Sequence, residues 1–221
     1  MPLGFSWKVA DFIVSGCNRY VFEWLEKWPS ERIKDNFVCL VGEGGSGKSH
    51  LANIWANRVD ADVITSGSDI FSKWYEISSS DTTQKHFVLD DADQIGDDIL
   101  LYYIYNTVKE KRGHVLMTAK SPPSRWRIKL PDIRSRISTI SVINIQGPND
   151  EEMKKIFEKM LERRGIRVHE EVINYICNRI DRSYGAMNYW AQQVDHLAGS
   201  NRREILQKLR TKLRSDPVRL E

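Results

Sequence analysis

The sequence predicts an α/β fold, in which a five-stranded parallel sheet carries helices on both faces and is followed by a small α-helical domain. Two observations support this prediction. Short apolar, β-favouring runs alternate with helical patterns through the first part of the chain, and only helical patterns follow residue 147. Because parallel neighbours need a crossover, such alternation is typical of a parallel sheet covered on both sides. We expect an α/β domain over residues 1–147 and a helical domain over residues 148–221.

Five runs in the first domain have the composition of strands. In chain order they are Phe37–Val41, Asp62–Thr65, His86–Asp91, His114–Thr118 and Ile137–Ile145. Helical patterns separate them, and these cover Tyr20–Leu25 behind a cap at Asn18, 50–58, Ile70–Tyr75 behind a cap at Asp69, Ile99–Val108 and a short turn at Pro131–Arg136. This order predicts repeated strand–helix units.

The turn cluster Gln146–Asp150 is the clearest boundary signal in the chain. Beyond it we expect four helices, over Glu151–Arg164, Val172–Ile180, Ser183–Leu197 and Arg202–Leu213. Their apolar residues recur at helical spacing, which indicates a small bundle with its own core.

The run Gly42–Ser49 fills the phosphate-loop template Gly-x-x-x-x-Gly-Lys-Ser/Thr, between a predicted strand and a predicted helix. Small residues let successive N–H groups surround phosphate oxygens, and the helix presents its positive end to them. Lys48 would neutralise the β- and γ-phosphates, and the Ser49 hydroxyl would bind Mg²⁺. The alternative is an ordinary glycine-rich turn. The candidate nucleotide-contacting residues here are Gly42, Gly44, Gly45, Ser46, Gly47, Lys48, Ser49 and His50.

The third predicted strand ends in two carboxylates, Asp90 and Asp91. Beside a phosphate loop, Asp90 is the candidate Mg²⁺-side acid together with Ser49, and Asp91 is the candidate for orienting the attacking water. Two acids at a strand end are also compatible with a helix cap. Thr118, at the end of the fourth strand, could contact the γ-phosphate or the lytic water.

An extended segment before the first strand could offer backbone groups to an adenine edge. Its candidate residues are Phe12, Ile13, Val14 and Asn18, and core packing is the alternative for their side chains.

The composition bounds the class of protein. Of 221 residues 41% are hydrophobic, enough for a substantial core, and 33 basic against 30 acidic residues favour no particular partner. The three cysteines are widely spaced, which indicates reduced thiols. There is no apolar core of signal-peptide length at the start and no run long enough to span a bilayer. We expect a cytoplasmic protein without membrane contact.

With these motifs in this order, the chain resembles the AAA+ ATPase family, and within it the clade of the initiator DnaA and its short regulators of the Hda type. The resemblance covers nearly the whole chain. The segments that carry it are Asp11–Asn18, Gly42–Ser49 (Walker A), Phe87–Asp91 (Walker B), Thr118 (sensor 1), Ser121–Pro123 and Leu130–Arg136. The last of these is the most specific.

The resemblance implies ATP or ADP with Mg²⁺ as ligands and DnaA as partner. It implies an arginine finger at Arg136 that stimulates ATP hydrolysis by DnaA in trans and so restrains replication initiation. Apart from the resemblance, Arg134 and Arg136 would be solvated surface charges. A homodimer is kept as an alternative assembly.

Three positions depart from that pattern. Gly185 stands where DnaA-like proteins carry a sensor-2 arginine, which leaves Arg182, one turn earlier, as the candidate nucleotide contact. Lys120 stands where relatives often have an acid. Met1–Phe5 lacks the glutamine-led motif that holds the DNA polymerase sliding clamp, so the clamp is only an alternative partner. No helix-turn-helix DNA-binding domain is expected after the helical domain.

Two other functions remain open. An autonomous AAA+ ATPase, acting as a replication factor or helicase loader, is favoured by Asp90 and Asp91, and Gly185 counts against it because slow intrinsic hydrolysis is then expected. A DNA-binding factor would use the basic residues between Arg202 and Arg214, although such a helix is more often a solvated face.

Overall fold

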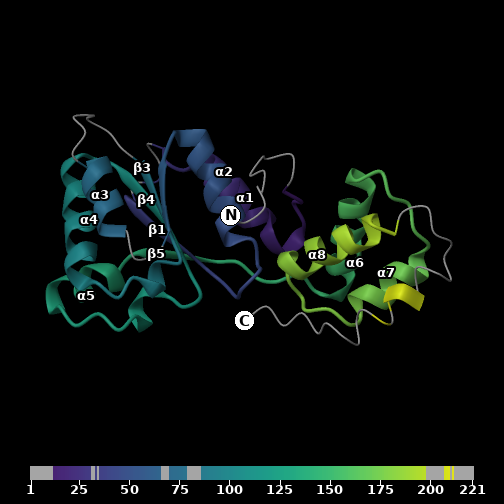
Figure 1. The fold of residues 1–221 in the computed structure, drawn as a ribbon. Helices are drawn as coiled ribbons and strands as arrows, with labels where there is room; N and C mark the ends of the chain where they lie inside the picture. Colours follow the sequence, from purple (N-terminus) through teal and green to yellow (C-terminus); the bar gives the residue numbers. More distant parts are fainter. Residues whose placement is uncertain are drawn as a thin grey trace. The chain divides into compact units, whose positions relative to one another are not determined.

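A computed structural model describes residues 12–30, 33, 35–65, 70–78, 86–197, 207–209 and 211 (Figure 1). Two compact units share the chain. The sheet unit takes the described residues of 1–12, 20–42 and 48–145, and the helical unit takes those of 13–19, 43–47 and 146–221. The predicted cap at Asp69 and most of the predicted helix Arg202–Leu213 lie outside the described residues.

All five strands of the sheet unit run parallel, in the order β2-β3-β4-β1-β5. The strands are β1 (Phe37–Val41), β2 (Asp62–Thr65), β3 (His86–Asp90), β4 (His114–Ala119) and β5 (Ser141–Asn144). β1 lies between β4 and β5, and β4 separates it from β3. The predicted parallel five-stranded α/β fold is therefore confirmed. The carboxyl ends of β1, β3 and β4 meet at one edge, which is where such folds place ligands.

Helices cover both faces of this sheet (Figure 1). One face carries α3 (Ile70–Ser78), α4 (Asp98–Glu110) and α5 (Pro131–Ser138), and the other carries α1 (Gly16–Lys27) and α2 (Lys48–Val59). Alternate residues of each central strand join the core on the α3–α5 side, for example Phe37, Cys39 and Val41 of β1. The three central strands, β1, β3 and β4, are buried along most of their length, as expected for a doubly covered parallel sheet.

The fifth strand is shorter than predicted. Ile137 and Ser138 belong to the end of α5, and only Ser141–Asn144 pairs with β1. Ile133 and Ile137 are both fully buried, four residues apart on one face of α5. The prediction of a strand from Ile137 was therefore wrong. The apolar residues Ile133 and Ile137, spaced i, i+4, favour a helix there instead.

The prediction that Asn18 caps the first helix was also wrong. α1 begins at Gly16, and Asn18 lies inside its first turn. Its side-chain oxygen accepts a hydrogen bond from the Ser15 N–H at 2.8 Å, as a third-position residue does in a capping box.

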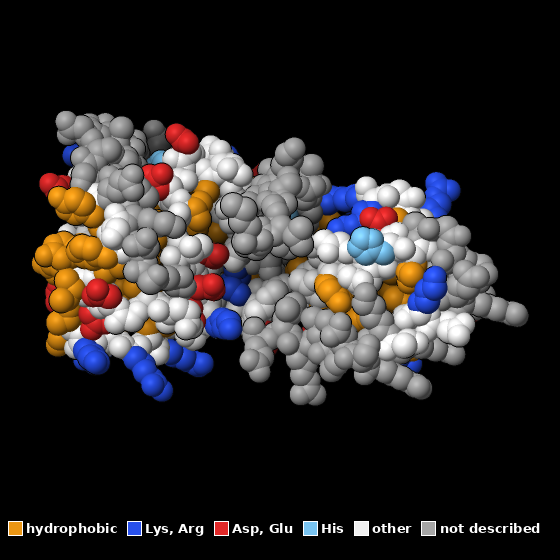
Figure 2. Space-filling model, viewed as in Figure 1, with side chains coloured by type: hydrophobic (Ala, Val, Ile, Leu, Met, Phe, Trp, Pro, Cys, Tyr) orange, Lys and Arg blue, Asp and Glu red, His pale blue; other side chains and the backbone are white. Residues whose placement is uncertain are grey.

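Hydrophobic side chains gather on the outward surface of α3 and α4 (Figure 2). The exposed members are Phe71, Tyr75, Ile99, Tyr102 and Tyr103. Contiguous apolar surface of this kind is typical of contact sites on otherwise soluble folds. Among the described helices, none is long and apolar enough to cross a membrane.

The helical unit contains α6 (Asp150–Arg163), α7 (Glu170–Cys177) and α8 (Tyr184–Asp195). α6 begins with a capping box between Asn149 and Glu152, which satisfies two backbone N–H groups. The apolar faces of the three helices meet in a separate core that includes Phe157, Ile176 and Trp190. The predicted helices after residue 148 are confirmed to within a few residues in the described part.

Two histidines face each other where β3 and β4 begin. The Nδ1 atoms of His86 and His114 are 3.3 Å apart. Burial lowers the pKa of both, helped by Arg58 for His86, and the neighbouring His86 helps to lower the pKa of His114 to about 4. The folded protein therefore disfavours the protonated form of this pair.

We expect the free energy of unfolding to fall as pH is lowered from about 6.5 towards 4. In that window the unfolded chain binds protons that the folded pair excludes, whereas above it both states are neutral and the stability is fully present. Denaturant unfolding near pH 5 and near pH 7.5 measures the effect. His114→Gln should reduce the difference in unfolding free energy between the two pH values, whereas replacement of the exposed His196 by Gln should not. Equal pH dependence in the wild type and both variants would contradict the assignment of this effect to the histidine pair.

Candidate functional site

The phosphate-loop run leaves the sheet at the end of β1. The Gly42 N–H donates to the Ala119 carbonyl of β4 at 3.2 Å, and α2 begins at Lys48. Gly45 and Gly47 have φ of +71° and +95°, values that residues with a Cβ rarely adopt. Strand, loop and helix thus follow in the predicted order, and the glycines stand where the backbone requires them.

Lys48 is nearly buried, with 6% of its surface exposed. Its Nζ donates to the Gly42 carbonyl at 2.7 Å. Burial lowers its pKa, and the nearby carboxylates of Asp91, Asp90 and Asp93 act against that shift. Lys48 is therefore a positive charge held by acids at the sheet edge, where an anionic ligand would replace lost solvation.

Three predicted residues meet around Asp90. Its Oδ1 accepts hydrogen bonds from the Ser49 hydroxyl at 2.9 Å and from the Thr118 hydroxyl at 2.5 Å. The Thr118 oxygen in turn accepts from the Asp91 N–H at 2.9 Å. Thr118 is fully buried, and the hydrogen of its hydroxyl is used in the hydrogen bond to Asp90. In this structure Thr118 orients the two acids, a role that the sequence did not suggest.

Asp91 adopts a left-handed backbone conformation, with φ 52° and ψ 46°. The residue is exposed at this turn, directly after the end of β3. Partial desolvation of its carboxyl, and then the charges of Asp90 and Asp93, raise the pKa of that carboxyl. A raised pKa suits a carboxylate that accepts a proton from water.

Asp93 is a member of this acidic cluster that the sequence reasoning missed. Its Oδ2 accepts from the Lys120 N–H at 3.0 Å, and its charge acts on both Lys48 and Asp91. A third acid in the run Asp90-Asp91-Ala92-Asp93 was the available signal. The short 3₁₀ helix Ala92–Gln94 turns it back towards the β4 end.

The hydroxyl of Ser49 and the carboxylate of Asp90 form the pair of hard oxygen ligands that Mg²⁺ prefers beside a phosphate loop. Their direct contact is the observation that makes them fit this ion. Phosphate oxygens and water would supply the remaining ligands.

The predicted base-side segment divides between the units. In the sheet unit Phe12 packs edge-on against His50, with ring centroids 5.1 Å apart. In the helical unit the Ile13 side chain is buried in the core, and its carbonyl accepts from Asn18 Nδ2 at 3.0 Å. Val14 is half-buried. The segment has no regular secondary structure, so its backbone groups are not used in a sheet.

Asn18 is fully buried and connects this segment to α8. Its Nδ2 also donates to the Tyr184 hydroxyl at 2.7 Å. The backbone N–H of Tyr184 donates to the Gly45 carbonyl at 2.8 Å. Within the helical unit, therefore, the loop tip and the base-side segment both contact the first residue of α8.

The two predicted arginines each contact an acidic side chain. Arg136, on α5, has 41% of its side chain exposed; its Nε contacts Asp132 at 3.1 Å, and its guanidinium lies 5.4 Å from the Tyr105 ring centre. Arg182 pairs with Asp150 at 2.9 Å, and both side chains are well exposed. Both arginines are held by acids of their own units.

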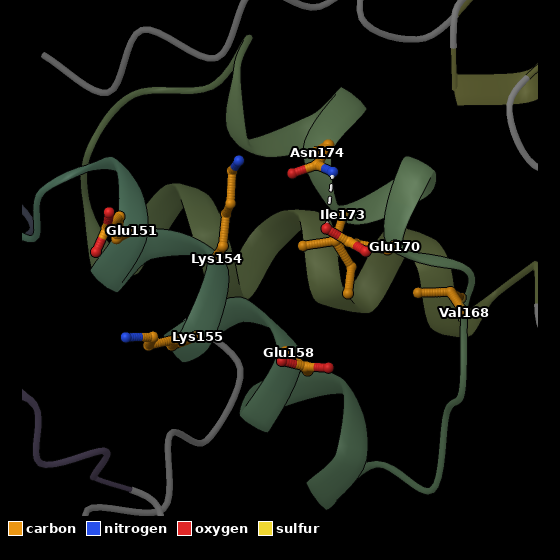
Figure 3. Close-up of a pocket in the computed structure, with 8 residues that line it drawn as sticks. All are labelled: Glu151, Lys154, Lys155, Glu158, Val168, Glu170, Ile173 and Asn174. Carbon is orange, nitrogen blue, oxygen red and sulfur yellow. Dashed lines mark hydrogen bonds between the residues drawn. The ribbon is translucent and has the colours of Figure 1, made fainter.

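A cavity of about 330 Å³ opens between α6 and α7 (Figure 3). Its lining residues are Glu151, Lys154, Lys155, Glu158, Val168, Glu170, Ile173 and Asn174. Three carboxylates and two ammonium groups share its wall, so it offers no concentrated charge for a phosphate. None of the predicted site residues lines it.

No family model matches the chain. An uncharacterized protein of Haemophilus influenzae is 27% identical over 164 residues, covering 69% of this chain and 70% of that protein.

Solved structures share the fold at low sequence identity. Domain III of the Thermotoga maritima replication initiation protein DnaA has a TM-score of 0.71 at 19% identity, over 99% of this chain and 100% of that one. AMPPCP-bound DnaA from Aquifex aeolicus has 0.71 at 20%, over 95% and 70%. The Thermotoga maritima RuvB Holliday junction branch migration motor has 0.69 at 14%, over 93% and 72%. The chain therefore has the fold of DnaA domain III.

Proposed function

We propose that the protein binds ADP or ATP with Mg²⁺ through the phosphate loop. The contact of Ser49 and Asp90 beside the nearly buried Lys48 is the observation that carries this proposal. The solved structure of Aquifex aeolicus DnaA with AMPPCP, an ATP analogue, is consistent with it. Calorimetric titration of the purified protein with ADP and ATP, with and without Mg²⁺, tests it; the absence of binding would overturn the proposal.

Each residue has a role in this proposal. Lys48, which donates to the Gly42 carbonyl, would pair with the phosphates, and Ser49 and Asp90 would hold Mg²⁺, which would supply positive charge to them. Thr118 holds the Asp90 carboxylate and the Asp91 backbone in place through its two hydrogen bonds, and Asp91 orients water. The raised pKa of Asp91 supports its role as proton acceptor.

We further propose that the protein regulates replication initiation by stimulating ATP hydrolysis on DnaA through Arg136. The likeness to DnaA domain III over 99% of this chain supports docking between two similar folds. The partial exposure of the Arg136 side chain, 41%, supports action on a neighbour. The test is the steady-state rate of ATP hydrolysis by purified DnaA as this protein is titrated in. An unchanged rate would overturn the regulatory role.

An autonomous ATPase, acting as a replication factor or helicase loader, is the second candidate. The Asp90–Thr118–Asp91 arrangement favours it, because both acids of a hydrolytic site are held in place. Gly185 argues against it, since glycine brings no charge to a γ-phosphate.

We expect the isolated protein to turn over ATP very slowly. Arg182 is the remaining candidate in the helical unit for a positive charge on the γ-phosphate, and it is paired with Asp150. Phosphate release under single- and multiple-turnover conditions measures this, with Asp90→Asn as the control for contaminating ATPase. Rapid multiple turnover without a partner would favour the autonomous ATPase, and Asp150→Ala would then show whether freeing Arg182 raises the rate.

A further inference from the structure

Ser183 and Tyr184, the N-cap and the first residue of α8, contact both the tip of the phosphate loop and the base-side segment, which the sequence predicts to face the adenine edge. Tyr184 reaches Gly45 through its backbone and Asn18 through its hydroxyl, all within the helical unit. We propose that the Ser183–Tyr184 step is a positioning element that sets the conformation of the phosphate-loop tip and of the base-side segment together. It would thereby determine nucleotide affinity and base selectivity. This inference rests on the nucleotide binding proposed above.

On the phosphate side, the contact admits only glycine. A Cβ at Gly45 would lie 2.5 Å from Ser183 Cβ and 2.9 Å from its Oγ. Ser183 is buried and cannot retreat freely, because its Oγ caps α8 by accepting the Ala186 N–H at 3.1 Å. The Tyr184 N–H lies in the first turn of α8, where a helix has no acceptors of its own, and it donates to the Gly45 carbonyl at 2.8 Å, so the positive end of α8 holds that carbonyl. The Gly45 carbonyl and the Ser46 N–H belong to the same planar peptide unit, so the hydrogen bond from Tyr184 also fixes the direction of the Ser46 N–H.

On the base side, the amide of Asn18 is fully used. Its oxygen accepts from the Ser15 N–H, and its nitrogen donates to the Ile13 carbonyl and to the Tyr184 hydroxyl. The segment from Ile13 to Ser15 is therefore wrapped around one buried amide. The Tyr184 hydroxyl, 3.3 Å from Ser15 Oγ as well, holds that amide in place. Without it, one buried N–H of Asn18 loses its partner, which costs free energy and loosens the segment.

A second-site rescue tests the phosphate side. Gly45→Ala should weaken Mg²⁺–ADP binding by about tenfold or more. Ser183→Gly, which removes the side chain beside the loop tip, should weaken binding by a smaller factor, because glycine is still an acceptable N-cap. The double variant should bind more tightly than the two single losses together predict, since only Ser183 Cα, 3.5 Å from the added Cβ, then remains in contact. The recovery should be partial, because the positive φ of residue 45 still strains alanine. Losses that simply add in the double variant would overturn this half of the inference.

Base selectivity tests the other half. Tyr184→Phe should lower the ratio of the GDP to the ADP dissociation constant by about threefold or more, because the proposed contacts of the base-side segment are the ones that would distinguish adenine from guanine. Tyr189→Phe is the matched control, since Tyr189 lies on the same helix and packs on Trp190. General loosening would weaken both nucleotides equally. An unchanged ratio would overturn the role of Tyr184.

The two proposals fail differently. If the wild-type protein binds no nucleotide, the proposed function fails and this inference fails with it. If the wild type binds ADP in a Lys48-dependent way but shows neither rescue nor a selectivity change, only the positioning role of the Ser183–Tyr184 step is wrong. Thermal unfolding of every variant separates lost affinity from lost folding.

Discussion

Replacing Arg136 by alanine is expected to abolish the stimulation of DnaA while leaving this protein's own nucleotide affinity unchanged. Asp132 and Tyr105 hold the Arg136 side chain, and neither belongs to the Lys48–Ser49–Asp90 cluster. Its planar charge would act on the γ-phosphate of a neighbour, where arginine fingers contribute about 10³–10⁵ in rate. The stimulated rate should therefore fall to that of DnaA alone.

The measurement is ATP hydrolysis by DnaA with each variant, together with the ADP affinity of each variant alone. Arg134→Ala removes an exposed charge from the same helix and should do much less. Arg136→Lys should also fail, because an ammonium cannot reproduce the planar fork. Asp132→Asn should reduce stimulation only in part, since it frees the guanidinium without removing it. Full stimulation by Arg136→Ala would rule out the trans-acting finger.

Lys48→Ala is expected to weaken the binding of both ADP and ATP by about ten- to a hundredfold or more, because hydrogen bonds between an ammonium and phosphate are charge-assisted. The same substitution should change the thermal stability of the nucleotide-free protein little. Burial already lowers the pKa of Lys48, which means that its charge is costly without a ligand.

Calorimetry with each nucleotide, and thermal unfolding without nucleotide, check both parts of this prediction. Lys129→Ala removes the same charge from an exposed side chain and is the matched control. Lys48→Met keeps most of the side-chain volume and should bind as weakly as alanine does. Equal affinity in Lys48→Ala and wild type would contradict the phosphate-loop assignment.

Most of the fold could be predicted, because local signals agree with the tertiary structure. The strands Phe37–Val41 and Asp62–Thr65 appear with the predicted bounds. Errors arose where two periods competed, as at Ile137, or where a polar side chain served a distant partner. Asn18 resembled a helix cap, yet its donor pairs with Tyr184, 166 residues away.

By itself the sequence determined the phosphate-loop spacing from Gly42 to Ser49, the strands that precede the acids, and the AAA+ resemblance. Those features are local, since a glycine-rich turn between strand and helix needs no distant partner. Only the tertiary structure decided which side chains meet. Asp90 contacts Ser49, 41 residues away, and Thr118, 28 residues away, because parallel strands bring their carboxyl ends to one edge of the sheet. The contact of α8 with Gly45 depends likewise on the packing of segments that no local pattern connects.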